Sequence, residues 1–203
     1  LVISDLITKS GIRATPIMWI TPLQYPIITK WVEDNKPNGL ITVVMKYGDY
    51  EFIRKNPDWL FTQTKKSRTG WMSKKWKAQS DYLKKWKYNL FITGRRIGDG
   101  NNCGVKENNY IKSGKVYDTF NIIADWTHEE VLAYIKYYGI ELPPNYFWRN
   151  GFKIGSGAWA ERDAYGLTVN EVWGDIYDID KSIVYEASNY IDSAKEFLKA
   201  KVE

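Results

Sequence analysis

Two neighbouring arginines, Arg95 and Arg96, are the residues of this sequence best suited to chemistry with an anion. A guanidinium group donates a fork of N–H groups that fits two oxygens of a phosphate or sulfate at once. The pair follows the apolar run 90–93 and Gly94, an order that predicts a buried strand with both cations at its carboxyl end. Ligands of open α/β sheets bind at that end of the strands. We therefore expect an anion site at Thr93, Gly94, Arg95 and Arg96, where the glycine lets a ligand approach the backbone closely.

The alternative is that the two arginines form surface salt bridges with acids such as Asp99. Their position directly after a strand, Thr and Gly favours ligand binding over this alternative. Lys77, on a helix expected before the strand, could add a point charge to the same crevice. Trp71 or Trp126 could stack on an adenine ring, although a tryptophan in the position of Trp126 is more typical of a core.

Positive charge is concentrated in one third of the sequence, although the net charge of the whole chain is only +5. From Lys65 to Arg96, eleven Lys or Arg residues stand against the single acid Asp81, so this third carries +10 and the rest −5. Such a block indicates a polyanionic partner, either nucleotide phosphates or nucleic acid, or else a solvated lysine-rich face. Aromatic residues interleave with the lysines, as in proteins that bind single-stranded nucleic acid: Trp71, Trp76, Tyr82, Trp86 and Tyr88. Helical spacing, however, places Trp76 and Trp86 on an apolar stripe with Leu83 and so predicts that they are core residues.

Other catalytic side chains are scarce. The only histidine, His128, stands at an expected helix start, which argues against a Ser-His-Asp triad. The only cysteine, Cys103, excludes an internal disulfide and a cysteine-built metal site, and we expect it to be neither a nucleophile nor a ligand. No set of zinc ligands is present, so no metal site is predicted. The acidic pairs 129–130 and 178/180 are typical of helix starts.

Length and composition indicate one globular domain, or one domain with a helical tail, in a chain of 203 residues with 44% apolar and 26% charged residues. No apolar run approaches the ~20 residues of a membrane span, and no signal peptide is visible. A chain with one cysteine is expected in the reducing cytoplasm.

Alternating helices and apolar strands predict an α/β fold: an open, mainly parallel sheet with flanking helices. The expected strands cover 16–20, 40–45 and 90–94, and the expected helices 1–10, 24–35, 74–87, 128–138 and one C-terminal helix from about Asp180. Residues 47–73 are expected to be irregular and 98–114 to form a long loop. Thr127 is expected to cap its helix, with Glu130 completing a capping box and Trp126 largely buried.

Two segments in this order resemble the carboxyl half of the phosphoadenosine-phosphosulfate reductase family, in the adenine-nucleotide α-hydrolase-like superfamily. They are Ile92-Thr93-Gly94-Arg95-Arg96 with Asp99, and the helix start Asp125-Trp126-Thr127. Weaker matches lie elsewhere. Segment 20–26 keeps the family's threonine as Thr21 without its aspartate, and segment 70–77 keeps Lys77 with Met72 in place of a cysteine. Segment 146–155 resembles a stretch that precedes further family cysteines, and Ser156 stands where one of those would be.

The resemblance implies an adenine nucleotide as ligand, either ATP or phosphoadenosine phosphosulfate, with or without Mg²⁺. The residues implied in binding it are Thr21, Lys77, Thr93, Gly94, Arg95 and Arg96. It also implies a nucleotide-binding domain over 1–140 and an aromatic, Gly-rich segment with the C-terminal helix over 141–203. The family's first strand and its Ser-Gly-Gly-Lys-Asp-Ser phosphate loop would lie upstream of Leu1.

The family's nucleophilic and cluster-binding cysteines have no counterpart in this sequence. We therefore expect neither thiol-based reduction nor an iron–sulfur cluster. What the resemblance leaves is nucleotide binding, and in a full-length form ATP-dependent adenylation of an acceptor in the manner of ATP pyrophosphatases. The alternative is a non-catalytic protein without a membrane partner, a homo-oligomer or a subunit of a larger assembly, that uses the basic segment 65–96 to bind nucleic acid.

Overall fold

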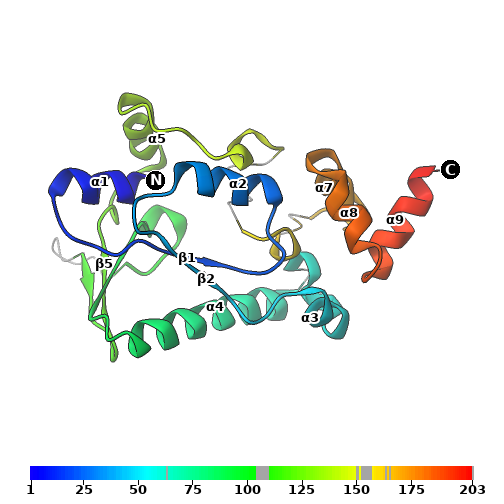
Figure 1. The fold of residues 1–203 in the computed structure, drawn as a ribbon, viewed down its shortest axis with the longest axis horizontal. Helices are drawn as coiled ribbons and strands as arrows, with labels where there is room; N and C mark the ends of the chain where they lie inside the picture. Colours follow the sequence, from blue (N-terminus) through cyan, green and yellow to red (C-terminus); the bar gives the residue numbers. More distant parts are fainter. Residues whose placement is uncertain are drawn as a thin grey trace. The chain divides into compact units, whose positions relative to one another are not determined.

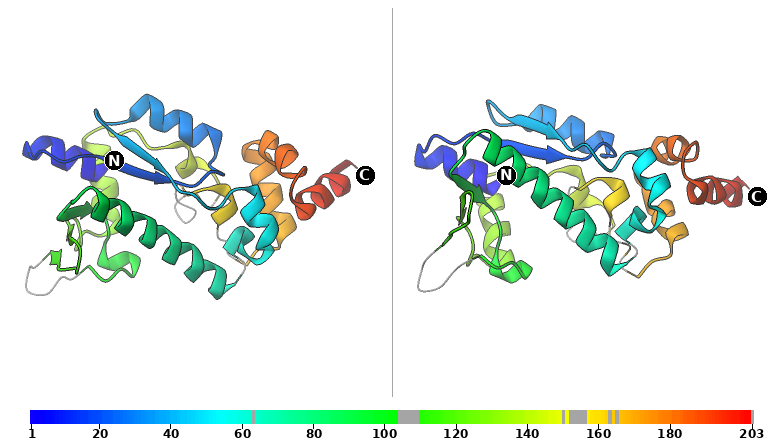
Figure 2. Two further views of the ribbon diagram at one scale, coloured as in Figure 1. Left: turned by 60° about the horizontal axis from the view of Figure 1, so that its bottom comes forward. Right: turned by 90° about the horizontal axis from the view of Figure 1, so that it is seen from below.

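The computed structural model describes residues 1–62, 64–103, 110–149, 151, 157–162, 164 and 166–202. The chain divides into two compact units, each built from two segments that are distant in sequence (Figure 1). Unit 1 consists of Leu1–Pro16 and Lys77–Leu142, and unit 2 consists of Ile17–Trp76 and Pro143–Glu203. The chain passes from unit 1 to unit 2 after Leu142, two residues after the domain boundary predicted at residue 140. It also passes from unit 2 to unit 1 between Trp76 and Lys77, inside the continuous helix α4 (Lys65–Lys85) (Figure 2).

Unit 1 contains a three-stranded sheet in the order β3 (Leu90–Thr93), β5 (Asp118–Asn121), β4 (Ile111–Lys112). Strand β3 is parallel to β5, with Leu90 opposite Asp118 and Thr93 opposite Asn121, while β4 is antiparallel to β5. The predicted strand at 90–94 is therefore confirmed as a strand, but it is not buried: Leu90 is exposed and the other three residues are half-buried, because in the described part of the sheet β3 lies at an edge and β5 is central. The 3-10 turn η2 (Ile97–Asp99) follows β3.

Two helices of unit 1 share a small apolar core. Helix α1 (Val2–Ser10) ends at Gly11, whose φ of 71° is in the left-handed region that favours glycine. Helix α5 (His128–Tyr137) begins with the predicted capping box: Glu130 N–H donates to Thr127 Oγ1 over 3.1 Å, and Thr127 N–H donates to Glu130 Oε2 over 2.7 Å. The buried residues of this core are Val2, Ile123 and Ile135.

Unit 2 contains a parallel pair of strands, β1 (Ile17–Ile20) and β2 (Ile41–Val44), with Ile17 opposite Ile41. The helix between them, α2 (Pro26–Asn35), starts with a proline, whose missing N–H is not needed at a helix start. The two strands and the helix confirm the prediction for this segment. The described strands thus form two small sheets and not one larger open sheet, so the fold class is mixed α/β with parallel strand pairs.

The core of unit 2 combines aliphatic side chains with several large aromatic ones. It is built by the following elements: α3 (Tyr50–Lys55), η1 (Pro57–Thr62), the start of α4, η3 (Pro144–Phe147), η4 (Trp159–Glu161), α7 (Val169–Ile179), α8 (Lys181–Ala187) and α9 (Asp192–Val202). Phe61 lies 4.9 Å from Trp173 between ring centroids, and Trp59 lies 5.4 Å from Trp71. A Cβ at Gly70 would come within 2.3 Å of the Trp59 ring, so only glycine lets this ring pack against α4.

Several expectations about element bounds are wrong. Residues 47–73 are not irregular, because their aromatic side chains pack into the core and stabilise α3, η1 and the first part of α4. Helix α4 therefore begins at Lys65 and not near residue 74. The single expected C-terminal helix is interrupted after Ala187, and α7 precedes it. Within the described residues, no helix is both apolar enough and long enough to span a membrane.

Candidate functional site

The carboxyl end of β3 is fixed by a network of polar side chains. Thr93 Oγ1 donates to Asn121 Oδ1 over 2.8 Å, across the parallel strand pair. Arg95 N–H donates to Thr93 Oγ1 over 3.3 Å, and Asn121 Nδ2 donates to the Cys103 carbonyl over 2.8 Å. Gly94, between Thr93 and Arg95, is exposed. The network holds the backbone of the strand end in place before any ligand arrives, which lowers the entropy cost of binding one.

The two arginines at this end are in different electrostatic states. Arg96 donates to both carboxylate oxygens of Asp99, from Nη2 over 2.6 Å and from Nε over 3.0 Å. The expected alternative of a salt bridge is therefore correct for Arg96. Arg95 is half-buried, and no carboxylate in the described part of the chain lies within ion-pair distance of it. Arg95 is thus the arginine whose charge is available to an anion.

Cys103 lies close to this strand end and is buried. Burial raises the pKa of its thiol, and the positive charge of Arg95 partly opposes the rise. A thiol with a raised pKa is a weak nucleophile at neutral pH, which agrees with the expectation that Cys103 is not catalytic. Among the described residues, no group of three or more His, Cys, Asp or Glu side chains is placed to hold a metal ion.

Neither Lys77 nor Thr21 takes part in the hydrogen bonds described above for this strand end. Lys77 is solvent-exposed on α4, and its ammonium group lies 2.6 Å from the Asp81 carboxylate. Thr21 belongs to unit 2, where its side chain is buried and its hydroxyl has no hydrogen-bond partner in the part of the chain that is described.

The tryptophans of segment 65–96 are placed differently from expectation. Trp71 is a core residue whose Nε1 donates to the Trp59 carbonyl over 3.0 Å, so it has no free face for an adenine ring. Trp76 and Trp86, expected in the core, are 52% and 58% exposed. Their spacing with Leu83 is helical, but only Leu83 is covered by neighbouring elements. The basic segment therefore presents two indole rings to solvent.

Unit 2 contains a cluster of buried polar residues that the sequence does not predict. Arg162 is buried, and its Nη2 donates to Asp175 Oδ2 over 2.5 Å, while Arg149 Nη1 donates to Asp175 Oδ1 over 3.3 Å. Arg162 Nε and Nη1 and both amide atoms of Asn145 have no hydrogen-bond partner within the described residues, while the Tyr25 hydroxyl interacts with the Arg162 guanidinium. Burial raises the pKa of the Tyr25 hydroxyl, and the nearby Arg162 charge opposes this. Unpaired buried polar atoms of this kind mark positions for ordered water or a ligand.

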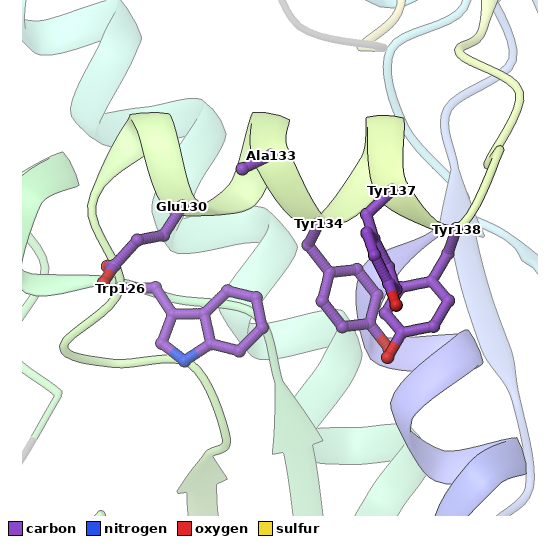
Figure 3. A pocket seen from close by; sticks show the side chains of 6 residues that line it. All are labelled: Trp126, Glu130, Ala133, Tyr134, Tyr137 and Tyr138. Carbon is purple, nitrogen blue, oxygen red and sulfur yellow. The ribbon is translucent and has the colours of Figure 1, made fainter.

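An aromatic groove lies along α5 in unit 1, with a volume of about 540 Å³ (Figure 3). Its lining residues are Trp126, Glu130, Ala133, Tyr134, Tyr137 and Tyr138. Trp126 is half-buried and not largely buried as expected, because its indole forms one wall of this open groove. Of the two tryptophans considered for stacking, only Trp126 has an accessible surface.

The expected resemblance of residues 146–155 and Ser156 falls partly outside the described residues, which omit 150 and 152–156. No protein-family model matches the sequence, and no curated protein matches it significantly.

Proposed function

We propose that this chain binds an adenine nucleotide, ATP or phosphoadenosine phosphosulfate, with the phosphate or sulfate at the carboxyl end of β3. The observation that carries the proposal is Arg95, a half-buried cation without an acidic partner in the described residues, directly beyond a strand that pairs in parallel. A charge of this kind is costly unless an anion compensates it. In this arrangement Arg95 contacts the ligand, while the α-carbon of Gly94 faces Ile3, whose side chain would lie 3.1 Å from a Cβ at this position.

Arg96 has a different role in the proposed site. Its guanidinium group is held by Asp99, and its carbonyl accepts a hydrogen bond from Asn101 Nδ2 over 3.3 Å. Arg96 therefore shapes the turn after β3 and positions Arg95. In a form that includes an upstream phosphate loop, the same site would present ATP with Mg²⁺ for adenylation of an acceptor, since the family's thiol chemistry has no residues here.

Isothermal titration with ATP and phosphoadenosine phosphosulfate tests the proposal on this chain and on a version continued upstream. Because a charge-assisted hydrogen bond contributes about 1.5–3 kcal/mol, we expect Arg95→Ala to weaken binding by about tenfold or more. Arg95→Lys keeps the charge without the fork and should lie between Arg95→Ala and the parent. Lys30→Ala, which removes an exposed lysine of unit 2, should leave binding unchanged. The proposal fails if neither form binds a nucleotide or if Arg95→Ala binds as the parent does.

A second function, binding of single-stranded nucleic acid by the basic segment 65–96, is favoured by the exposure of Trp76 and Trp86. Lysines in this segment would contact phosphates while the indole rings stack on bases. Fluorescence anisotropy with a labelled single-stranded oligonucleotide should then show affinity that falls steeply with salt. Trp86→Ala should weaken the complex about tenfold, given the ~1–3 kcal/mol that stacking contributes per base. If the parent does not bind the oligonucleotide, this function is excluded; if Trp76→Ala and Trp86→Ala both bind as the parent does, stacking on these two rings is excluded.

A further inference from the structure

The aromatic groove on α5 has the composition of a site for an organic cation. Trp126 and the tyrosines lie along one side of α5, where the Trp126 and Tyr134 rings are in contact, and the small side chain of Ala133 leaves the surface beside the rings uncovered (Figure 3). Ring centroids are 5.4 Å apart for Trp126 and Tyr134, and 4.4 Å apart for Tyr134 and Tyr138. Tyr137 is the most exposed of these rings, at 81%. Aromatic faces carry negative potential and attract cations, above all when several rings meet.

One cation of the chain already lies against this cluster. The ammonium group of Lys9, on α1, is 3.0 Å from the centroid of the Tyr138 ring and 5.2 Å from that of Tyr134. The same ammonium lies 2.6 Å from the Asp5 carboxylate, so the pair is neutral and adds no net charge to the groove. The contact shows that these rings accept an alkylammonium group at short distance. It also occupies one face of Tyr138 and leaves the groove between Trp126 and Tyr137 for another group.

One carboxylate lines the groove, and the nearest cation, Lys9, is paired with Asp5. The Glu130 carboxylate is part of the lining. Glu129, beside it in the sequence, has a pKa below its ordinary value, because backbone N–H donation and the Thr127 hydroxyl stabilise its charged form, helped by the Arg96 charge. Arg96 itself is compensated by Asp99. The groove therefore combines four aromatic rings with a carboxylate, on a protein whose overall charge is positive.

We propose that the groove formed by Trp126, Glu130, Tyr134, Tyr137 and Tyr138 binds the quaternary ammonium group of a small organic cation such as choline. A trimethylammonium group presents a diffuse positive charge on methyl groups, which matches aromatic walls better than it matches a hydrogen-bonding pocket. The groove is shallow and open to solvent, so a small cation would contact the rings on one side and keep water on the other. This inference is independent of nucleotide binding, since neither Arg95 nor Arg96 lines the groove.

Ligand-observed NMR with choline and with its neutral carbon isostere, 3,3-dimethyl-1-butanol, tests the inference. The two molecules have the same shape and differ in charge, so choline should bind about tenfold more tightly if cation–π attraction holds it. Ala133→Leu fills the groove with an exposed, helix-favouring side chain and should abolish binding. Tyr137→Leu removes an exposed ring and should weaken choline about tenfold without affecting folding. Circular dichroism of each variant verifies that the fold is kept.

Matched variants separate charge from structure. Glu130→Gln keeps an acceptor for the capping box and removes the charge, so it should weaken choline and leave the isostere unchanged. Lys9→Met frees the face of Tyr138 and should strengthen choline binding. Tyr185→Leu removes an exposed tyrosine of unit 2 and should have no effect. The inference is overturned if choline does not bind, if the isostere binds equally well, or if Ala133→Leu and Tyr185→Leu bind choline alike.

Discussion

Asp175 is the acid on which the buried charge of unit 2 depends. It accepts hydrogen bonds from Arg162, which is buried, and from Arg149, which is largely exposed. Removing one partner of a buried ion pair costs far more than the pair contributes, because the remaining charge is left without compensation in a medium of low polarity. Arg162 and Asp175 are 13 positions apart in sequence, so no local sequence pattern distinguishes this buried pair from surface charges.

Asp175→Asn should therefore lower the free energy of unfolding by about 3–5 kcal/mol, as measured by urea denaturation at neutral pH. The matched control is Asp34→Asn, which removes the acid of an exposed pair with Lys30 and should change stability by no more than about 1 kcal/mol. Equal midpoints for the two variants would show that Arg162 finds other compensation in the folded chain.

Cys103 gives a second expectation about a single residue. Since burial raises the pKa of its thiol, the reactive thiolate is scarcer at any neutral pH than in an ordinary cysteine. Ellman's reagent should react with the folded protein much more slowly than with the protein in urea. The ratio between the two reaction rates should decrease as pH rises toward the raised pKa of the Cys103 thiol. Fast reaction of the folded protein at pH 7 would contradict the buried placement.

At the level of elements, two helices begin with the same device. Thr127 and Glu130 cap α5, and Thr168 and Glu171 cap α7 with the same pair of reciprocal hydrogen bonds. In α7 the Thr168 N–H and hydroxyl donate to Glu171 Oε2, both over 2.8 Å. These donors lower the pKa of Glu171 from its ordinary value of 4.5.

A lowered pKa makes the capping contribution of Glu171 dependent on pH. The contribution is fully present above the unfolded pKa and is lost as pH falls through the lower folded pKa. We expect the melting temperature to fall on acidification below about pH 4.5, in the range where the ordinary glutamate titrates. Glu171→Gln keeps the cap without a titratable group, so its melting temperature should fall less over the same range. If the melting temperatures of the parent and of Glu171→Gln fell equally with pH, Glu171 would not be the source of the pH dependence.

The sequence predicts elements well where one local signal decides them. The apolar runs of β1, β2 and β3 and the periodicity of α1, α2 and α5 are of this kind, and the structure confirms all six. Strand β5, Asp-Thr-Phe-Asn, has no apolar run and exists because β3 offers it a parallel partner. Helix α7 also has a local signal in its sequence, the capping box formed by Thr168 and Glu171. Residues 47–62 fold because distant aromatic side chains cover them, and no local pattern contains that information.

The same limit applies to the candidate site. The position of Arg95 and Arg96 beyond a strand follows from the sequence and is confirmed. Which of them is neutralised depends on the turn η2, which brings Asp99 back to Arg96. The exposure of Trp76 and Trp86 depends on which elements cover α4, and the buried state of Arg162 depends on the assembly of unit 2.

At the level of the whole molecule, α4 is the element that belongs to both compact units, since the boundary at Trp76 and Lys77 lies within it. A continuous helix transmits unfolding from one unit to the other, because fraying on one side removes hydrogen bonds from the other. Lys77→Pro should destabilise the chain by about 3 kcal/mol, since proline removes a helical hydrogen bond and clashes with the preceding turn. Calorimetry should then resolve two transitions for Lys77→Pro and a single one for the parent.

Lys77→Ala is the control for that experiment, because it removes the same exposed side chain and its contact with Asp81 but favours the helix. It should keep a single transition near that of the parent. Two transitions already present in the parent would show that α4 does not couple the units.

The packing of α1 against α5 has a consequence for folding during translation. Lys9 meets Tyr134, which is added to the chain 125 residues later. At a translation rate of ~5–20 residues per second, roughly 6–25 s pass between the synthesis of α1 and that of the helix it packs against. During that interval its apolar face, including Val2, is uncovered and is available to chaperones or to neighbouring nascent chains. The rate of translation between residues 10 and 134 therefore sets how long this chain is open to misassembly.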